Sequence, residues 1–509
     1  MSNAASKPEL EPAPSVACTP TPVAGRRASE IDVLRLVPPL AWLVKQRWFQ
    51  FAVVLPNLIL FVLFLAAGIF GTPVGNRNII IVFVWILWWF VLISVMVPFA
   101  SRLWCAVCPF PFFGEWIQRR ALVRTRSFDP RTEKKSATGV TIGRNRYFGK
   151  NLKWPKALTN IWIQNIGFLM LCTFSALFLT RPIVSVVVLG SLFLIATVLH
   201  VIYRQRTFCS YVCPVSGFLS LFSMASTLEI RPRDTNVCTT CKEKACLAGS
   251  EHGWGCPWLL YPSKLERNNY CGLCMECVKT CTHDNMTVKL RPFCSDTVLK
   301  GYDEAWKAFI MLALAAAYSV LYQGPWGSFK DWANISEKLN WRGFGLYTAT
   351  LWSASLLLIP AVFVGAVQAG RLLARRRGAE ENAAAPAFKE VFLAFVYPLV
   401  PLGLLAWVTF SLPLLLVNGS YILMVSSDPF GWGWNLFGTA NIPWTPLVPH
   451  WGPYLQVPLL LIGLYFALKT GKAHASRLFA DQRSALKAFA PTATVLTSFV
   501  VFFLWLYVG

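Results

Sequence analysis

CTTCKEKACLAGSEHGWGCPWLLYPSKLERNNYCGLCMECVKTC, residues 238–281, contains eight cysteines within 44 residues. The later four, from Cys271 to Cys281, have the spacing C-x2-C-x2-C-x3-C. In that spacing three thiolates surround one cubane iron–sulfur cluster, and the fourth reaches a neighbouring cluster. The stretch therefore predicts two [4Fe-4S] clusters held close together.

The earlier four cysteines follow a different spacing. They read C-x2-C-x4-C, and after nine residues comes Cys256-Pro257. Thr282 stands where a proline usually follows the last cysteine of the run. These departures concern the pairing of the thiolates and leave the set of ligands intact. If the crossover holds, one cluster has the ligands Cys238, Cys241, Cys246 and Cys281, and the other has Cys256, Cys271, Cys274 and Cys277.

Zinc sites and disulfides are the alternative uses of these cysteines. Pairs of C-x2-C also make tetrahedral zinc sites, but a long gap normally separates the two pairs, and residues 271–281 have no such gap. Disulfides belong to oxidising compartments. Since the flanking sequence indicates a reducing compartment, iron–sulfur clusters are the favoured interpretation.

The composition is that of a membrane protein. Of 509 residues, 55% are hydrophobic and only 14% are charged, and the mean hydropathy is +0.50. The net charge of +23 would suggest nucleic-acid binding in a soluble domain. In a membrane chain, however, basic residues gather in cytoplasmic loops. We therefore expect no nucleic-acid partner.

Nine stretches are apolar enough to be spanning helices, which need about 20 residues each. They are residues 51–70, 79–100, 161–179, 183–202, 305–322, 346–367, 391–417, 454–468 and 490–508. The fifth and eighth are short and the seventh is long, so the count is good to one either way. Residues 1–30 are rich in Pro, Ala and Ser, which predicts a disordered cytoplasmic tail.

Loop charge predicts the orientation. Thirteen Lys and Arg lie in residues 101–158, and further basic clusters lie in residues 370–389 and 469–487. The intervening loops are poor in cations, and residues 418–453 contain none. By the positive-inside rule, the N-terminus and residues 203–304 are cytoplasmic and the C-terminus is extracytoplasmic.

Two further cysteine pairs follow the second and fourth predicted helices. One is Arg102-Leu-Trp-Cys105-Ala-Val-Cys108-Pro109, and the other is Arg206-Thr-Phe-Cys209-Ser-Tyr-Val-Cys213-Pro214. Both have an arginine three residues before the first cysteine and a proline directly after the second. This is an internal repeat. Two hairpins inserted the same way, related by an axis along the membrane normal, would bring their cytoplasmic ends together.

We expect a third metal centre from these pairs, most simply another [4Fe-4S] cluster. Its ligands would be Cys105, Cys108, Cys209 and Cys213. A redox-active dithiol and a copper site are alternatives that use the same thiols. Buried, inert cysteines at helix ends are the non-functional alternative.

Residues 50–295 resemble the NapH, NosR and CcoG group of membrane ferredoxin-type proteins. Cys209-Ser-Tyr-Val-Cys213-Pro214 fits the C-x3-C-P motif of that group, and Cys105-Ala-Val-Cys108-Pro109 is one residue shorter. The resemblance implies four helices, a two-cluster ferredoxin module, and electron transfer with the quinone pool. CcoG-like members imply a different function, metal handling during assembly of a respiratory oxidase.

The sequence thus predicts an all-α polytopic membrane protein of about nine transmembrane helices with an inserted cytoplasmic ferredoxin-like module. Its function would be electron transfer between quinone and an unidentified redox protein, as an electron carrier or a quinol dehydrogenase subunit. A non-redox iron–sulfur subunit is a further alternative. The expected location is the bacterial inner membrane. The expected divisions are residues 1–30 (tail), 31–204 (helices one to four), 205–300 (module) and 301–509 (helices five to nine).

Overall fold

The fold is described from a computed structural model of the chain. The described residues are 30–121, 128–296, 298–323, 327–335, 339–374, 386–479 and 481–508. Of the tail predicted over residues 1–30, all but Glu30 lies outside the described residues.

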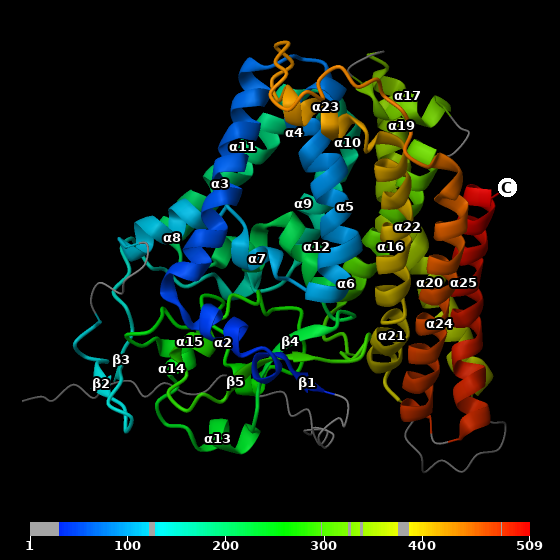
Figure 1. Cartoon of the computed structure of the whole chain (residues 1–509). Coiled ribbons are helices and arrows are strands. Elements are labelled where there is room, and N and C mark those ends of the chain that lie inside the picture. The colour runs from blue at the N-terminus through cyan, green and yellow to red at the C-terminus, as the bar shows by residue number, and fades with distance from the viewer. Residues whose placement is uncertain are drawn as a thin grey trace, which may run out of the picture.

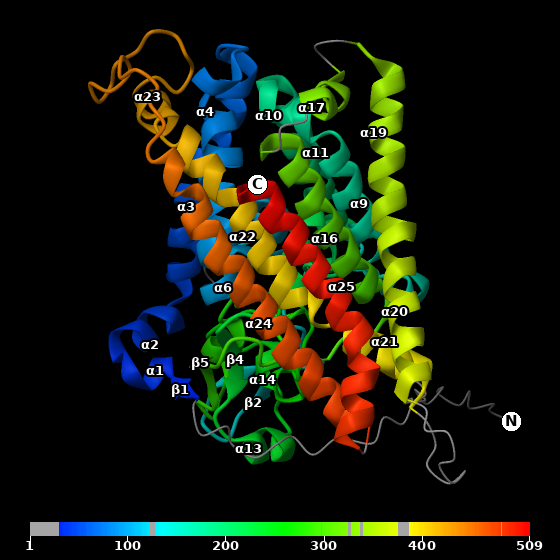
Figure 2. The same cartoon turned by 90° about the vertical axis from the view of Figure 1, so that its right-hand side faces the viewer.

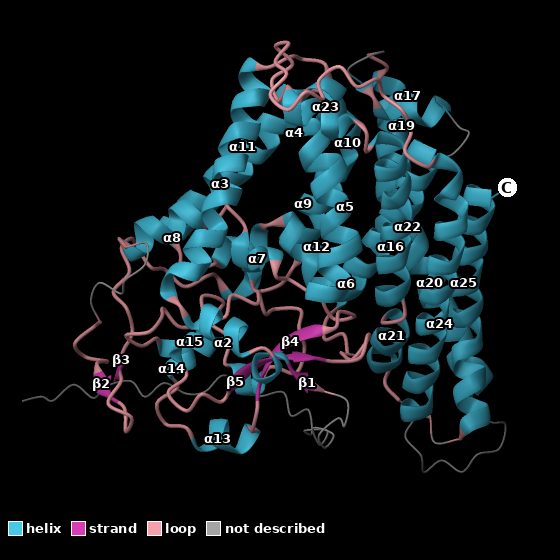
Figure 3. Ribbon diagram, in the orientation of Figure 1, coloured by secondary structure: helices cyan, strands magenta, loops and turns pink. Residues whose placement is uncertain are grey.

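Helices make up most of the described chain (Figure 3), and eight helical segments in it are long and apolar enough to cross a membrane. Each overlaps one of the predicted spans, which confirms a multi-pass membrane protein of the expected fold class. The segments are α3 (Arg47–Phe70), α4 to α6 (Ile79–Ala100), α11 (Pro182–Ile202), α16 (Tyr302–Gln323), α19 to α20 (Trp341–Ala374), α21 and α22 (Phe388–Asn418), η8 and α24 (Pro449–Leu478), and α25 (Gln482–Val508).

The third predicted span, residues 161–179, is divided in two. Helix α9 (Trp162–Thr173) ends where Phe174 leaves helical geometry, and α10 (Ser175–Thr180) follows. Twelve residues rise only about 18 Å, which is too short for a bilayer core of about 30 Å. Neither piece therefore spans alone, and this accounts for the difference between eight and nine.

Several spanning segments are built from consecutive pieces, and short helices cap the bundle. The second span consists of α4 (Ile79–Ile81), η2 (Val82–Trp88), α5 (Trp89–Val91), η3 (Leu92–Met96) and α6 (Val97–Ala100). The fifth and sixth consist of α19 (Trp341–Ser353), η7 (Ala354–Leu358), α20 (Ile359–Ala374), α21 (Phe388–Val396) and α22 (Leu399–Asn418). The remaining pieces are η1 (Gly75–Arg77), η4 (Lys156–Leu158), α17 (Gly327–Ala333), α23 (Tyr421–Ser427), η8 (Pro449–Trp451) and α24 (Gly452–Leu478).

Helix α22 is the centre of the bundle (Figure 2), and almost all of its apolar window is buried. Trp407 on this helix joins the two halves of the chain. Its ring packs against Trp89 and Phe218 from the first half and Tyr318 from the second, with centroids 5.5–6.1 Å apart. Residues 301–509 are thus packed onto the cysteine repeat rather than forming a separate body.

The eight-cysteine stretch lies at one end of the bundle (Figure 1), around a small antiparallel sheet in the order β1-β5-β4. Strand β5 (Met286–Leu290) pairs with β4 (Leu228–Pro232) and with β1 (Ile31–Asp32). The other elements here are α1 (Val33–Leu36), α2 (Pro38–Lys45), β2 (Lys134–Lys135), β3 (Thr141–Ile142), α13 (Thr235–Thr240), α14 (Ala245–Ala248), η6 (Pro262–Lys264) and α15 (Glu276–Thr280). Leu34 and Val44 pack in this core, so residues 31–45 lie with the module, although the divisions drawn from the sequence group them with the membrane helices.

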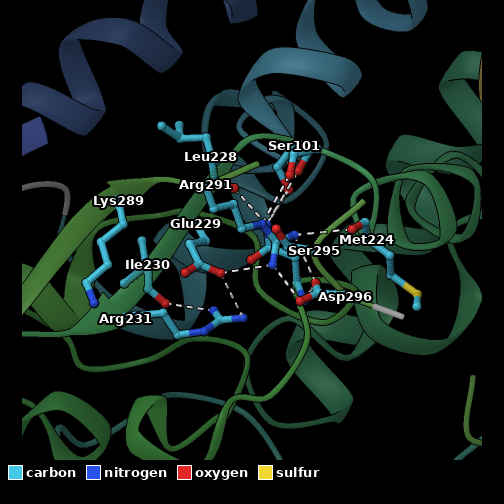
Figure 4. A network of polar contacts seen from close by, with 12 residues as sticks. Ser101, Met224, Leu228, Glu229, Ile230, Arg231, Lys289, Arg291, Ser295 and Asp296 are labelled. Carbon is cyan, nitrogen blue, oxygen red and sulfur yellow. Dashed lines mark hydrogen bonds and ion pairs between the residues drawn. The ribbon is translucent and has the colours of Figure 1, made fainter. Parts of the chain in front are cut away.

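Arg291 fixes this module to the bundle (Figure 4). Its side chain is buried and makes ion pairs with Glu229 at 2.9 Å and Asp296 at 2.5 Å. It also donates to the backbone carbonyls of Ser223, Met224 and Ser226 at 3.1–3.3 Å. Those carbonyls follow the last turn of a bundle helix, α12 (Pro214–Phe222). One guanidinium therefore joins the end of the β4–β5 pair where Leu228 is opposite Leu290 to the membrane domain.

A second buried pair makes the same connection at the start of α16. Arg267 bonds both carboxylate oxygens of Glu304, at 2.8 and 3.1 Å. Glu304 also accepts from Asn269 at 2.9 Å and from Tyr270 at 3.1 Å. These residues directly precede Cys271, so the bundle holds the chain in place where the second run of cysteines begins.

Candidate metal centres

The sequence predicts three sets of four ligand cysteines, called groups A, B and C below. Every cysteine in the described part of the chain is free of disulfides. Group A is Cys238, Cys241, Cys246 and Cys281; group B is Cys256, Cys271, Cys274 and Cys277; group C is Cys105, Cys108, Cys209 and Cys213.

Group A lies farthest from the membrane helices, next to α13 and α14 (Figure 1). The Cys246 thiol interacts electrostatically with the other three thiols of the group. Burial, followed by these neighbouring thiols, raises the pKa of Cys246 to about 12. Asn285 donates to two sulfurs of the group at 3.3 Å, from its side chain to Cys238 and from its backbone to Cys281. Because ligands must be deprotonated, a bound cluster would have to displace the Cys246 proton.

Group B adjoins group A. The Cys277 thiol interacts with the other three thiols of its group and also with Cys246 of group A. The Cys256 amide donates to the Cys246 carbonyl at 3.0 Å. Cys281, although close in sequence to group B, interacts with the group A thiols, as the crossover pattern requires.

The loop around group B has the backbone of an anion-binding site. Leu273 and Met275, which alternate with the cysteines, have φ of 50° and 61°. Left-handed residues between ordinary ones turn successive N–H groups inward, and such nests hold many iron–sulfur clusters. The four thiols and the loop conformation therefore fit an anionic cubane.

Group C is assembled from the two copies of the repeat. Cys105 lies on α7 (Trp104–Val107) and Cys209 on η5 (Phe208–Val212). Cys213 caps α12, where its sulfur accepts the Ser216 amide at 3.4 Å. All six pairs among the four thiols interact electrostatically. The duplicated hairpins thus place four thiols together, three of them buried, as the repeat predicted.

A helix follows each Cys-Pro step, but the two helices differ. Helix α8 (Phe112–Arg119) lies against α11 with Trp116 exposed. Helix α12 is buried along its length within the bundle, although the divisions drawn from the sequence group it with the module. A proline in the first helical position is favourable because its missing N–H has no intrahelical partner there.

Two arginines and a tryptophan lie between groups B and C. The Trp258 indole packs under Arg102 and Arg206, whose guanidinium carbons are 4.6 and 5.9 Å from the ring centroid. Arg102 interacts with Cys213 of group C and Cys271 of group B. Arg206 likewise interacts with thiols of both groups. In the sequence, these arginines are matched positions of the repeat. Only the fold shows that both lie between groups B and C.

Lys307 on α16 is a third cation beside group C, and it is fully buried. Its ammonium donates to the Gln164 carbonyl at 3.4 Å and lies 4.8 Å from the Phe168 ring centroid. It interacts electrostatically with Cys172 and with Cys213, and no acidic partner is present for it among the described residues. Four thiolates around iron are net anionic, so a cluster bound at group C would favour the protonated form of this amine.

The thiols of each group are not packed around one point. Among the described residues, no three His, Cys, Asp or Glu side chains lie close enough to hold a single metal ion. Zinc needs its sulfurs about 2.3 Å from one centre.

A family model described as a 4Fe-4S binding domain matches residues 81–128 and 186–228. The two matched segments are the two copies of the repeat and contain all four group C cysteines. No curated protein and no solved structure matches the chain. The match supports an iron–sulfur electron-transfer role, and the apolar helices indicate a multi-pass membrane protein.

Proposed function

We propose that the chain transfers electrons through three [4Fe-4S] clusters, held by groups A, B and C, between a soluble redox protein and membrane quinone. The contiguity of the three groups carries this proposal. Group A meets group B through Cys246 and Cys277, and group B meets group C across Trp258. Single electrons moving through cubanes are the chemistry that this arrangement suits.

The burial of the three groups supports an order in which group A faces a soluble partner and group C faces the membrane. Group A cysteines are only partly buried, whereas three of the four group C cysteines are buried at the ends of membrane helices. A soluble partner would therefore meet group A, and a lipid-soluble carrier would meet group C. The proposal has the module on the cytoplasmic side of a bacterial inner membrane and the C-terminus on the extracytoplasmic side, as loop charge predicts, in a NapH-like arrangement.

Iron counting tests the clusters. Anaerobically purified protein should contain about twelve irons and as many labile sulfides per chain, four for each cluster. The double variant Cys105→Ser and Cys209→Ser should lose about four irons and keep the other eight. Cys294→Ser is the matched control, because Cys294 is buried but belongs to no group. Iron unchanged in the double variant would exclude a cluster at group C.

Quinol oxidation tests the function. A quinol analogue added to the oxidised protein should reduce clusters, which paramagnetic resonance detects. If no quinol or quinone exchanges electrons while a copper or iron salt is turned over, the chain handles metals instead. Clusters that no physiological reductant reduces would indicate a non-redox subunit.

A further inference from the structure

A cavity lies between the start of α3, helix α8, the loop after α14 and helix α15, where the membrane helices meet the module. It is open to solvent, and its lining combines apolar and charged side chains. The cavity is defined here as the α3–α8 cavity.

One wall of the α3–α8 cavity is apolar and comes partly from a helix long and apolar enough to cross a membrane. Phe51 and Val54 come from the first two turns of α3, and Phe112 comes from the first turn of α8. Ile59, farther along α3, and Trp116, on α8, are exposed at 60% and 44%, as lipid-facing side chains are. A ligand with an apolar tail could therefore enter from the bilayer.

The opposite wall is polar and rigid. Glu115 is paired with Arg206 and, at 3.4 Å, with Arg119, while Lys279 is paired with Glu276 at 2.8 Å. Cations held in place by such pairs can stabilise negative charge as it develops on an oxygen atom. Among small ligands, this favours a ring with carbonyl or hydroxyl oxygens at its edge.

Cys108 of group C also lines the α3–α8 cavity. An occupant would thus lie directly beside a proposed cluster ligand. His252, whose side chain is 56% exposed, stands at the same cavity and marks a side open to water. The α3–α8 cavity therefore adjoins a proposed cluster. It also offers access for a lipid tail and a side from which protons can leave to water.

We propose that the α3–α8 cavity binds the headgroup of a membrane quinone or quinol with its ring beside Cys108. This inference rests on the proposed function. A quinol that gives up two electrons and two protons becomes a quinone. The electrons leave one at a time towards group C and a one-electron acceptor at the module, and the protons pass to water at the opening. Quinone reduction is the reverse.

Photoaffinity labelling tests the site without relying on turnover. The intact protein in lipid nanodiscs is irradiated with an azidoquinone, and the labelled peptides are identified by mass spectrometry. Label should fall on residues 47–54 and 108–119, and excess quinone should suppress it at least tenfold. Excess anionic phospholipid that suppresses the label while quinone does not would show a lipid site and overturn the proposal.

Two variants locate the label. Val54→Trp fills the cavity from its apolar wall and should reduce labelling at least tenfold, with iron content unchanged. Val62→Trp is the control, because it makes the same change on the exposed side of α3. If Val54→Trp does not fold, Phe51→Ala should weaken labelling at least threefold. Labelling unchanged in the variant that folds would overturn the proposal.

The outcomes separate this inference from the proposed function. Quinol that reduces the clusters of the Val54→Trp protein as fast as those of the original protein would reject the cavity and leave the function standing. Specific labelling of the cavity in a protein whose clusters exchange no electrons with quinol would support the site and reject the function.

Discussion

The module and the repeat hold their cysteines in opposite ways. In the module, groups A and B come from one stretch of 44 residues, and the ligands lie on loops and short helices. In the repeat, group C combines two segments whose Cys-Pro steps are 105 residues apart, at the ends of membrane helices. Module ligands are therefore set largely by local backbone, whereas group C exists only when two helical hairpins are packed together.

The charges and hydrogen bonds around group A also differ from those around group C. Group A receives two hydrogen bonds from Asn285 and lies near water. Group C lies among the buried side chains of Arg102, Arg206 and Lys307. Since cluster potentials depend on nearby charge, hydrogen bonds and exposure, the comparison predicts a higher potential at group C than its burial alone would give.

The largest expected effect is a loss of stability at Arg291, which connects the module to the membrane bundle. Arg291→Met leaves the buried Asp296 carboxylate without its guanidinium partner and leaves Glu229 with Arg231 alone. Breaking a buried pair in this way costs about 3–5 kcal/mol. We expect the variant to have a lower unfolding temperature and a module that proteases cleave readily while the bundle stays intact.

Lys300→Met is the control for this joint. Lys300 pairs with Glu266 at 3.0 Å, but both side chains are more than half exposed. Exposed pairs contribute about 0–1 kcal/mol. Equal losses in the two variants would mean that Arg291 does not hold the module to the bundle.

A smaller effect is expected from the cation beside group C. An anionic cluster at group C would keep Lys307 protonated; Lys307→Gln then removes a positive charge, which favours the less negative, oxidised form of that cluster. The potential of one cluster should fall on the order of 60 mV, a tenfold change in a one-electron equilibrium. Redox titration followed by paramagnetic resonance measures this. Lys300→Gln should leave every cluster potential unchanged. Potentials that shift at two clusters in Lys307→Gln would contradict a position of Lys307 beside group C.

The smallest effect is expected at group A. Asn285→Ala removes the side-chain hydrogen bond to Cys238. A neutral hydrogen bond near water contributes about 0.5 kcal/mol, which corresponds to about 20 mV. The exposed Asn236, on α13 close to the same group, provides the matched Asn236→Ala control. A change in cluster potential in Asn285→Ala as large as that in Lys307→Gln would contradict the difference in surrounding charge between groups A and C.

The sequence predicted the membrane class and the repeat because both depend on short-range patterns. Apolar runs of about 20 residues gave the spans, and Arg102 and Arg206 aligned the two copies of the repeat. The ligand sets and the resemblance to NapH-like proteins stay predictions. Iron counting is the measurement that decides the ligand sets.

Other features depend on contacts that no local pattern reports. Trp258 meets two arginines from different hairpins, and Lys307 reaches group C from a helix beyond the resemblance. The apolar run at residues 161–179 did not show the break at Phe174, because hydropathy averages over such details. The α3–α8 cavity likewise draws its walls from segments spread over residues 47–279.

Strand β1 has a consequence for biosynthesis. Its partner β5 is translated only after α3 and α11, which lie between the two strands in the sequence. Until then the edge formed by Ile31 and Asp32 has no partner on the nascent chain. A chain truncated before Met286 would contain all twelve predicted ligand cysteines but could not close the sheet beside them.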